Sequence, residues 1–237
     1  MKQTYFTFAF FAAIAFSACS SDDGKRIIGD IENVSCRSCV PAYCTSDGFD
    51  MGYRYGNKDN KRIYISWGAK NDYTISCAPE LLPYIVGQEN DFMEYATRNN
   101  DLTYTGVVSV HVDPIACSDN FKAIHVAAAE DWDEKHPAGT PLDELFTFRG
   151  SSYAPYIRSG YDNDKFDPNN YNTIISKRFS ELTADDLCIL DIEMVFIAES
   201  APADKQKIHE LTFTFVTDEG VEKPTTIRYS WADGVIE

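Results

Sequence analysis

Apolar and polar residues alternate with a period of two in several segments of this 237-residue chain. The alternation is clear from Arg62 to Trp67 and from Leu187 to Ser200, and it returns from Gly106 to Pro114, where three valines share one face. A strand places successive side chains on opposite faces, whereas a helix would scatter the acids of these segments into its apolar stripe. The segments are therefore predicted to be half-buried strands.

Two further regions extend this pattern. Residues 124–128 alternate after turn residues at 117–120. Near the C-terminus, residues 209–217 and 225–231 alternate on either side of Asp218-Glu219-Gly220, which supplies residues that favour a turn. This arrangement predicts a C-terminal hairpin.

Signals for helices are few and short. Thr140 precedes Pro141 and two acids, which is the pattern of a helix N-terminus with a capping hydroxyl. Residues 91–98 and 183–187 are each compatible with one or two helical turns. Many strands, few helices and turn residues between the strands favour an all-β fold. We predict a single antiparallel β-sandwich of immunoglobulin-like or related type over residues 34–237.

The first 18 residues have the features of a secretory signal. Lys2 precedes an apolar run over residues 5–16 that is too short to span a bilayer as a helix, and the small residues Ser17 and Ala18 precede Cys19. The segment resembles bacterial lipoprotein signals, which implies cleavage before Cys19 and acylation of its thiol. The alternative is an ordinary cleaved signal peptide in which Cys19 is incidental.

The polar residues 19–33 are predicted to form a flexible acidic tether. Their first part, residues 20–23, resembles the surface-export signal of Bacteroidetes-type lipoproteins, which implies an outer-membrane protein that faces the outside medium. Contact with the membrane is expected only through the lipid on Cys19. The formal net charge of −16 would repel nucleic acid, so no nucleic-acid partner is expected.

Besides Cys19, the chain has six cysteines. An even number in an oxidising compartment favours disulfides, although the spacing leaves the pairing open and is compatible with some thiols staying reduced. A metal knuckle at the first three is the alternative, but no second Cys-x-x-Cys or paired histidines complete a tetrahedral site. The disulfide candidates are Cys36, Cys39, Cys44, Cys77, Cys117 and Cys188.

The sequence shows no established catalytic motif. It has neither a Gly-x-Ser-x-Gly elbow nor a phosphate-binding glycine loop, and its four histidines are far apart, so no cofactor and no metal are expected. His209 is expected to be exposed or to form a hydrogen bond across strands. The acidic loop 161–171 has the oxygen ligands that calcium prefers, but Asp167 and Thr173 stand where an EF-hand requires glycine and glutamate.

Aromatic residues are the candidates for ligand contact. Trp132 lies among four carboxylates and would suit a sugar-stacking platform, while a group of tyrosines follows in one expected loop region. The alternative is that the acids form a solvated loop and the aromatic rings pack in the core. The candidates are Trp132, Tyr153, Tyr156, Tyr161 and Tyr171.

Residues 137–146 read Pro-Ala-Gly-Thr-Pro-Leu-Asp-Glu-Leu-Phe. Together with the lipoprotein signal, the cysteine-rich start and the C-terminal hairpin, this phrase resembles a family of Bacteroidetes surface lipoproteins with a domain of unknown function. The resemblance covers most of the chain after the signal and implies no catalytic residues.

Three functions remain open from the sequence. We expect a non-catalytic surface lipoprotein that binds an extracellular glycan or protein. The first alternative is a structural or accessory subunit of a surface assembly, joined through an unprotected sheet edge. The second is a glycoside hydrolase, which requires two facing carboxylates in a cleft, one of them with a raised pKa.

Overall fold

The computed structural model describes residues 37–45, 49–52, 61–67, 73–76, 89–105, 115–166 and 172–236. Residues Ser35–Glu237 form one compact unit. The predictions for the signal peptide, Cys19, the tether and residues 106–114 lie outside the described residues, as do Cys36, Cys77 and Tyr171. Among the described helices, none is long and apolar enough to cross a membrane.

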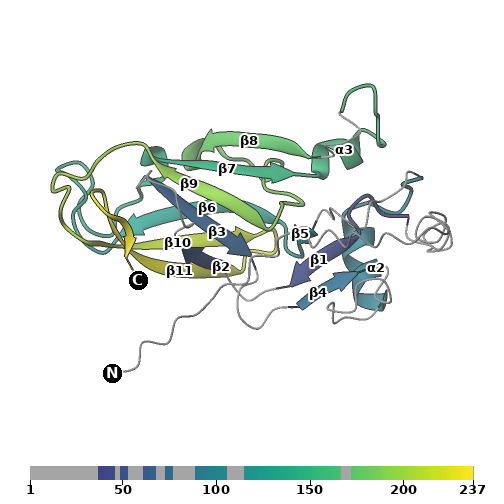
Figure 1. Cartoon of the computed structure of the whole chain (residues 1–237), viewed down its shortest axis with the longest axis horizontal. Helices are drawn as coiled ribbons and strands as arrows, with labels where there is room; N and C mark the ends of the chain where they lie inside the picture. Colours follow the sequence, from purple (N-terminus) through teal and green to yellow (C-terminus); the bar gives the residue numbers. More distant parts are fainter. Residues whose placement is uncertain are drawn as a thin grey trace, which may run out of the picture. The chain divides into compact units, whose positions relative to one another are not determined.

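Two antiparallel sheets pack against each other, which confirms the predicted all-β sandwich (Figure 1). The five-stranded sheet has the order β2 (Phe49–Gly52), β3 (Arg62–Trp67), β9 (Glu193–Ala198), β7 (Phe146–Ser152) and β8 (Thr173–Arg178). The four-stranded sheet has the order β12 (Gly234–Ile236), β11 (Glu222–Ser230), β10 (His209–Thr217) and β6 (Phe121–Ala128).

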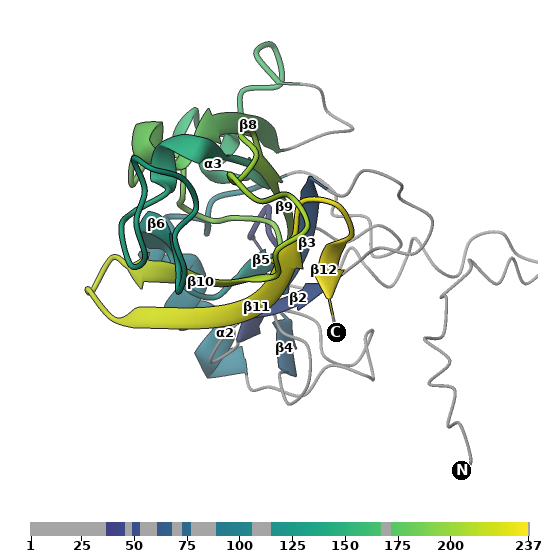
Figure 2. The same cartoon turned by 90° about the vertical axis from the view of Figure 1, so that its left-hand side faces the viewer.

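Phenylalanines from both sheets fill the space between them. Phe196 of β9 lies 5.0 Å from Phe213 and 5.7 Å from Phe215 of β10, measured between ring centroids, and Phe49 of β2 stacks on Phe215 at 3.5 Å. Figure 2 shows β10 and β11 on one side of this core and β8 on the other. Each buried ring stabilises the fold by roughly 1.5–3 kcal/mol, so this layer holds the sandwich together.

The predicted hairpin is confirmed. β10 and β11 pair from His209 opposite Tyr229 to Val216 opposite Glu222, and Gly220 takes the left-handed φ of 89° that the turn requires. The strand predictions at 62–67 and 124–128 are also confirmed, as β3 and as part of β6. In both strands the apolar residues of the alternation are buried.

The strand predicted from Leu187 to Ser200 is too long, because β9 begins only at Glu193. Leu187, Ile189 and Leu190 are all buried, so this stretch does not present one apolar face as a regular strand would. Ile189 has a φ of 48°, which breaks the extended conformation. Isolated bridges from Leu190 to Ser152 and from Asp191 to Ala116 replace continuous pairing.

The helix predictions are confirmed in one place. Residues 91–98 lie in α2 (Glu89–Arg98), whereas 183–187 form hydrogen-bonded turns. The helix predicted after Thr140 is wrong: a single 3-10 turn, η1 (Asp143–Leu145), is present, and the Thr140 hydroxyl donates to the Pro137 carbonyl oxygen instead of capping a helix. A second 3-10 turn is η2 (Phe179–Glu181).

A small third sheet lies beside the sandwich, with the order β4 (Tyr73–Ser76), β1 (Ala42–Thr45) and β5 (Ile115–Cys117). β1 and β5 are parallel, which departs from the predicted antiparallel pattern. α2 packs on this sheet, with the rings of Phe92 and Tyr43 5.7 Å apart. The same buried cluster includes Tyr156 of α3 (Ala154–Arg158), so α2 and α3 share one apolar core.

Candidate functional site

Trp132 is a core residue, which corrects the predicted sugar platform. Its side chain is 0% exposed, and its ring lies 5.0 Å from His209 and 5.9 Å from Phe146. The backbone of the loop is closed at this residue, where the Trp132 amide donates to the carbonyl oxygen of His136 at 2.9 Å. His209 is likewise buried, and neither ring nitrogen has a hydrogen-bond partner among the described residues, contrary to the exposed or hydrogen-bonded role expected.

The tyrosines are also mostly internal. Tyr153 and Tyr156 are buried, and their hydroxyls donate to Asp191 at 2.7 Å and to Asn163 at 2.8 Å. Tyr161 is half-buried and donates to Asp101 at 3.0 Å. Tyr153 and Tyr156 therefore do not offer an exposed ring to a partner, and the aromatic contact surface predicted there is wrong.

The described part of the acidic loop is held by contacts of its own. One carboxylate oxygen of Asp162 accepts from the amide of Asp164 at 3.0 Å, and the other pairs with Lys165 at 2.8 Å. The hydrogen bond from Lys165 is the main reason that the pKa of Asp162 is lowered. Among the described residues, no group of three or more histidine, cysteine or acidic side chains is placed to hold a metal ion.

No two described cysteines lie at disulfide distance, which corrects the disulfide prediction for this part of the chain. Cys39 and Cys117 are buried thiols in different apolar clusters, and Cys188 is a partly exposed thiol in the irregular stretch before β9. Cys44 and Cys117 are opposite one another on the parallel strands β1 and β5.

We predict that iodoacetamide will modify Cys188 of the folded protein well before Cys39 and Cys117. Burial raises the pKa of all three thiols, but Cys188 is the most accessible of them and its thiolate is favoured by the neighbouring Arg158. Peptide mass spectrometry over a time course measures the order. Cys188→Ser should remove the fast phase, and labelling of Cys39 or Cys117 at the rate of Cys188 would contradict their burial.

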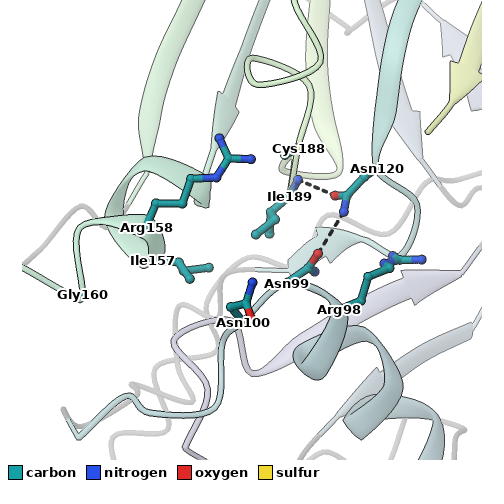
Figure 3. A pocket seen from close by; sticks show the side chains of 9 residues that line it. All are labelled: Arg98, Asn99, Asn100, Asn120, Ile157, Arg158, Gly160, Cys188 and Ile189. Atoms are coloured by element: carbon teal, nitrogen blue, oxygen red, sulfur yellow. Dashed lines mark hydrogen bonds between the residues drawn. The ribbon is translucent and has the colours of Figure 1, made fainter.

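A pocket of about 380 Å³ lies where the end of α2, the end of α3 and the stretch before β9 meet (Figure 3). Arg98, Asn99 and Asn100 come from the end of α2, and Ile157, Arg158 and Gly160 from the end of α3. Asn120, just before β6, and Cys188 with Ile189 complete the nine lining residues that Figure 3 labels. Two helix ends and two loops thus build one concave site within the usual size range of ligand pockets.

A chain of side-chain amides fixes the wall of the pocket. The Asn120 amide donates to the side-chain oxygen of Asn99 at 2.9 Å, and its own oxygen accepts from the backbone amide of Ile189 at 2.8 Å. Asn99 in turn donates to the Tyr43 hydroxyl at 3.2 Å. Because Asn99 and Asn120 are both buried, these bonds hold α2 and the stretch before β9 at a fixed spacing.

Two arginines stand at the rim. Arg98 donates to the carbonyl oxygen of Ser118, and Arg158 pairs with the exposed Asp185 at 3.0 Å. None of the nine described lining residues is acidic, although the chain has 37 acids and 21 bases. The pocket therefore combines amides, guanidinium groups and the apolar side chains of Ile157 and Ile189.

The backbone of the pocket is unusual at two points. Asn100 has a φ of 56°, which asparagine tolerates after a helix end, and Ile189 has a φ of 48°, which is rare for a β-branched residue. Such a conformation costs about 1–3 kcal/mol and persists where neighbours enforce it. Here the side-chain oxygen of Asn120 accepts a hydrogen bond from the Ile189 amide, and the Tyr153 amide donates to the carbonyl oxygen of Ile189 at 3.0 Å. This strained backbone conformation therefore lies in the wall of the pocket, and such conformations cluster at ligand-binding sites in proteins.

Sequence reasoning did not identify the residues of this pocket. Arg98, Asn120 and Arg158 are separated in the chain and carry no motif, and only the positive charge at the end of a predicted helix could have drawn attention to Arg98. Comparisons with models of protein families, with curated proteins and with solved structures give no match for this chain.

Proposed function

We propose that this protein is a non-catalytic surface lipoprotein whose sandwich domain binds an extracellular glycan in the pocket between α2 and α3. The observation that carries the proposal is the pocket itself, whose wall is fixed by the bonds between Asn99, Asn120 and Ile189. Amide and guanidinium groups suit the hydroxyls of a sugar, because each can form paired hydrogen bonds. The side chains of Ile157 and Ile189 would contact the apolar C–H face of the ring.

The expected location agrees with this function. Acylation of Cys19 would hold the domain at the outer membrane, and residues 19–33 would give it reach into the medium. Extracellular glycans are available there. Location and pocket chemistry therefore favour glycans over intracellular ligands.

A glycan array followed by calorimetry tests the proposal with the full chain purified in detergent. Asn100→Gly keeps the left-handed backbone and removes an exposed amide from the pocket, so it should weaken binding of a glycan hit about tenfold, the effect of losing one or two good hydrogen bonds. Gln206→Gly removes an exposed amide outside the pocket and should leave the Kd unchanged. The absence of any glycan hit, or equal affinities of Asn100→Gly and the unmodified chain, would refute the proposal.

A second candidate is a subunit of a surface assembly joined by strand addition. The observation that favours it is β8, which among the described strands pairs with β7 alone and exposes 61% of Ile174. Lys177 and Arg178 on the same short strand discourage such pairing. A concentration-dependent mass in solution that Ile174→Lys abolishes would favour this candidate over glycan binding.

A further inference from the structure

We infer that the loop formed by residues 129–139 is a pH-sensitive closure, held by two histidines with opposite requirements for charge. His136 lies on the loop and binds its neighbours best when protonated, whereas His209 lies beneath the loop and fits only when neutral. The loop is therefore closed most tightly between acid and alkaline conditions. Closure of this kind does not depend on glycan binding in the pocket.

Backbone hydrogen bonds fix the loop to the sandwich. At its start, the Ala129 amide donates to the Glu210 carbonyl oxygen at 2.9 Å, and at its end the Gly139 amide donates to the last carbonyl oxygen of β6 at 2.8 Å. Between them, the Ala203 amide donates to the Trp132 carbonyl oxygen at 2.8 Å. Because backbone amides and carbonyls do not titrate, the pH dependence of the loop must come from its side chains.

His136 is held between two carboxylates. Its Nδ1 lies 2.7 Å from Asp133 and its Nε2 lies 3.1 Å from Glu144 of η1, and only 12% of its side chain is exposed. Both ring nitrogens can donate at once only in the protonated ring, which then joins the loop to η1. The hydrogen bond with Asp133 is the main reason that the pKa of His136 is raised. Asp143, the other acid of η1, pairs with His125 at 2.8 Å.

His209 requires the neutral form. Its side chain is 1% exposed, and neither ring nitrogen has a hydrogen-bond partner among the described residues. The loop covers this ring, because Trp132 lies 5.0 Å away between ring centroids and its indole nitrogen also lacks a described partner. Protonation would add a charge and a second donor to a space without an acceptor in place, which is costly in a protein interior.

The charged groups around His209 do not neutralise an imidazolium. Glu130 on the loop comes within 3.9 Å of Nδ1, but the same carboxylate oxygen already accepts from the backbone amide that follows His209, at 3.2 Å. Asp204 and Lys207, which precede β10, act on the ring in opposite directions, and the residue opposite it on β11 is Tyr229. Burial outweighs these charges and lowers the pKa of His209.

The two histidines determine opposite limbs of one pH profile. Below pH 6.5, the ordinary histidine value, an open loop lets His209 bind a proton that the closed loop rejects. Each unit of pH therefore favours opening by up to about tenfold, until the lowered pKa is reached. The contribution of His136 is complete below pH 6.5 and is lost as pH rises through its raised pKa. Closure is consequently tightest near pH 6.5.

Hydrogen exchange followed by mass spectrometry, on the full chain in detergent from about pH 5 to about pH 8, tests the inference. After correction for the intrinsic effect of pH on exchange, the peptide over residues 129–139 should be most protected near pH 6.5 and lose protection in both directions. A peptide over β9 should keep its protection. Constant protection of the loop, or equal changes in both peptides, would overturn the inference.

Three variants assign the two limbs. His209→Phe keeps an aromatic ring that gains no proton, so it should lose the fall in protection below pH 6.5. His136→Gln keeps one donor but cannot be protonated, so it should lose the fall above pH 6.5. His125→Gln is the matched control, because His125 is 56% exposed and lies outside the loop, and it should change neither limb. A limb that survives the loss of its own histidine would contradict the inference.

The unmodified chain decides the question if His209→Phe does not fold. NMR of the ring protons follows the titration of each of the four histidines, and replacing the other three one at a time assigns His209. His209 should titrate below pH 6.5 and His136 above it. Titration of His209 at or above pH 6.5 would show that the closed loop accepts the charge, and the inference would fail.

Discussion

Replacing Asp101 with alanine is expected to lower the free energy of unfolding by about 3–5 kcal/mol, the usual effect of removing one partner from a buried charged network. The Asp101 carboxylate is fully buried just after α2. It accepts hydrogen bonds from the hydroxyl of Ser38, from the amides of Cys39 and Val40 at 2.8 and 2.9 Å, and from the hydroxyl of Tyr161 at 3.0 Å. Alanine would leave these donors inside the protein without an acceptor.

The donors come from two distant segments, which explains the size of the effect. Residues 38–40 precede β1, and Tyr161 follows α3, so Asp101 joins both to the end of α2. The same stretch of chain carries Arg98, Asn99 and Asn100 into the pocket. Asp101 therefore supports the spacing of the pocket as well as the stability of the fold.

Urea unfolding followed by circular dichroism measures this prediction. Asp164→Ala removes an exposed carboxylate of the nearby loop and should change the free energy by less than about 0.5 kcal/mol. Asp101→Asn retains one carbonyl acceptor but turns an N–H group toward donors. It should therefore lower the free energy of unfolding by less than Asp101→Ala and by more than Asp164→Ala. A loss below about 1 kcal/mol for Asp101→Ala would show that the donors find other partners.

The pH dependence provides an independent check on Asp101. Burial raises its pKa above the value of 3.8 expected in the unfolded chain, and its hydrogen bonds oppose this shift only in part. The folded protein therefore binds this proton more tightly than the unfolded chain does. The part of the stability that comes from this difference in proton binding is complete below pH 3.8 and is lost as pH rises through the folded pKa, whereas the hydrogen bonds to Asp101 remain. Asp101→Asn does not titrate and should lack this part of the pH profile.

Strands with one buried face were predictable from the sequence. In β3 and β10 the side chains alternate strictly because one face meets the core and the other meets solvent. The strands of the small sheet are three or four residues long, too short to show a period. The stretch before β9 was misread because apolar residues on both sides are buried around the positive φ of Ile189.

The candidate site was less predictable for a different physical reason. The acids on both sides of Trp132 suggested that its ring is exposed. In the structure these acids reach solvent or local backbone donors, while the Trp132 ring is buried. The pocket depends on Arg98, Asn120 and Arg158, which only the packing of α2, α3 and the sandwich brings together. Single-sequence patterns report local periodicity and therefore did not reveal this assembly.

Replacing Trp132 with alanine is expected to destabilise the protein by about 3–5 kcal/mol, as other large cavities in cores do. The ring is 0% exposed and packs among Phe146, His209 and Tyr229, the last at 6.4 Å between centroids. Alanine would leave a cavity that these rings, fixed on β7, β10 and β11, cannot close. Denaturant unfolding of the full chain in detergent gives the loss in free energy.

Trp132→Phe separates packing from polar contacts. The indole nitrogen has no hydrogen-bond acceptor among the described residues, so phenylalanine removes a buried donor that lacks a partner while keeping most of the aromatic contact. Its cost should be about 1–2 kcal/mol, well below that of alanine. Because Trp132 does not line the pocket, the folded Trp132→Phe protein should keep the glycan affinity of the unmodified chain. If Trp132→Phe instead lost affinity for the glycan while keeping its free energy of unfolding, Trp132 would have to contact the ligand directly. Such contact would require the loop around Trp132 to open.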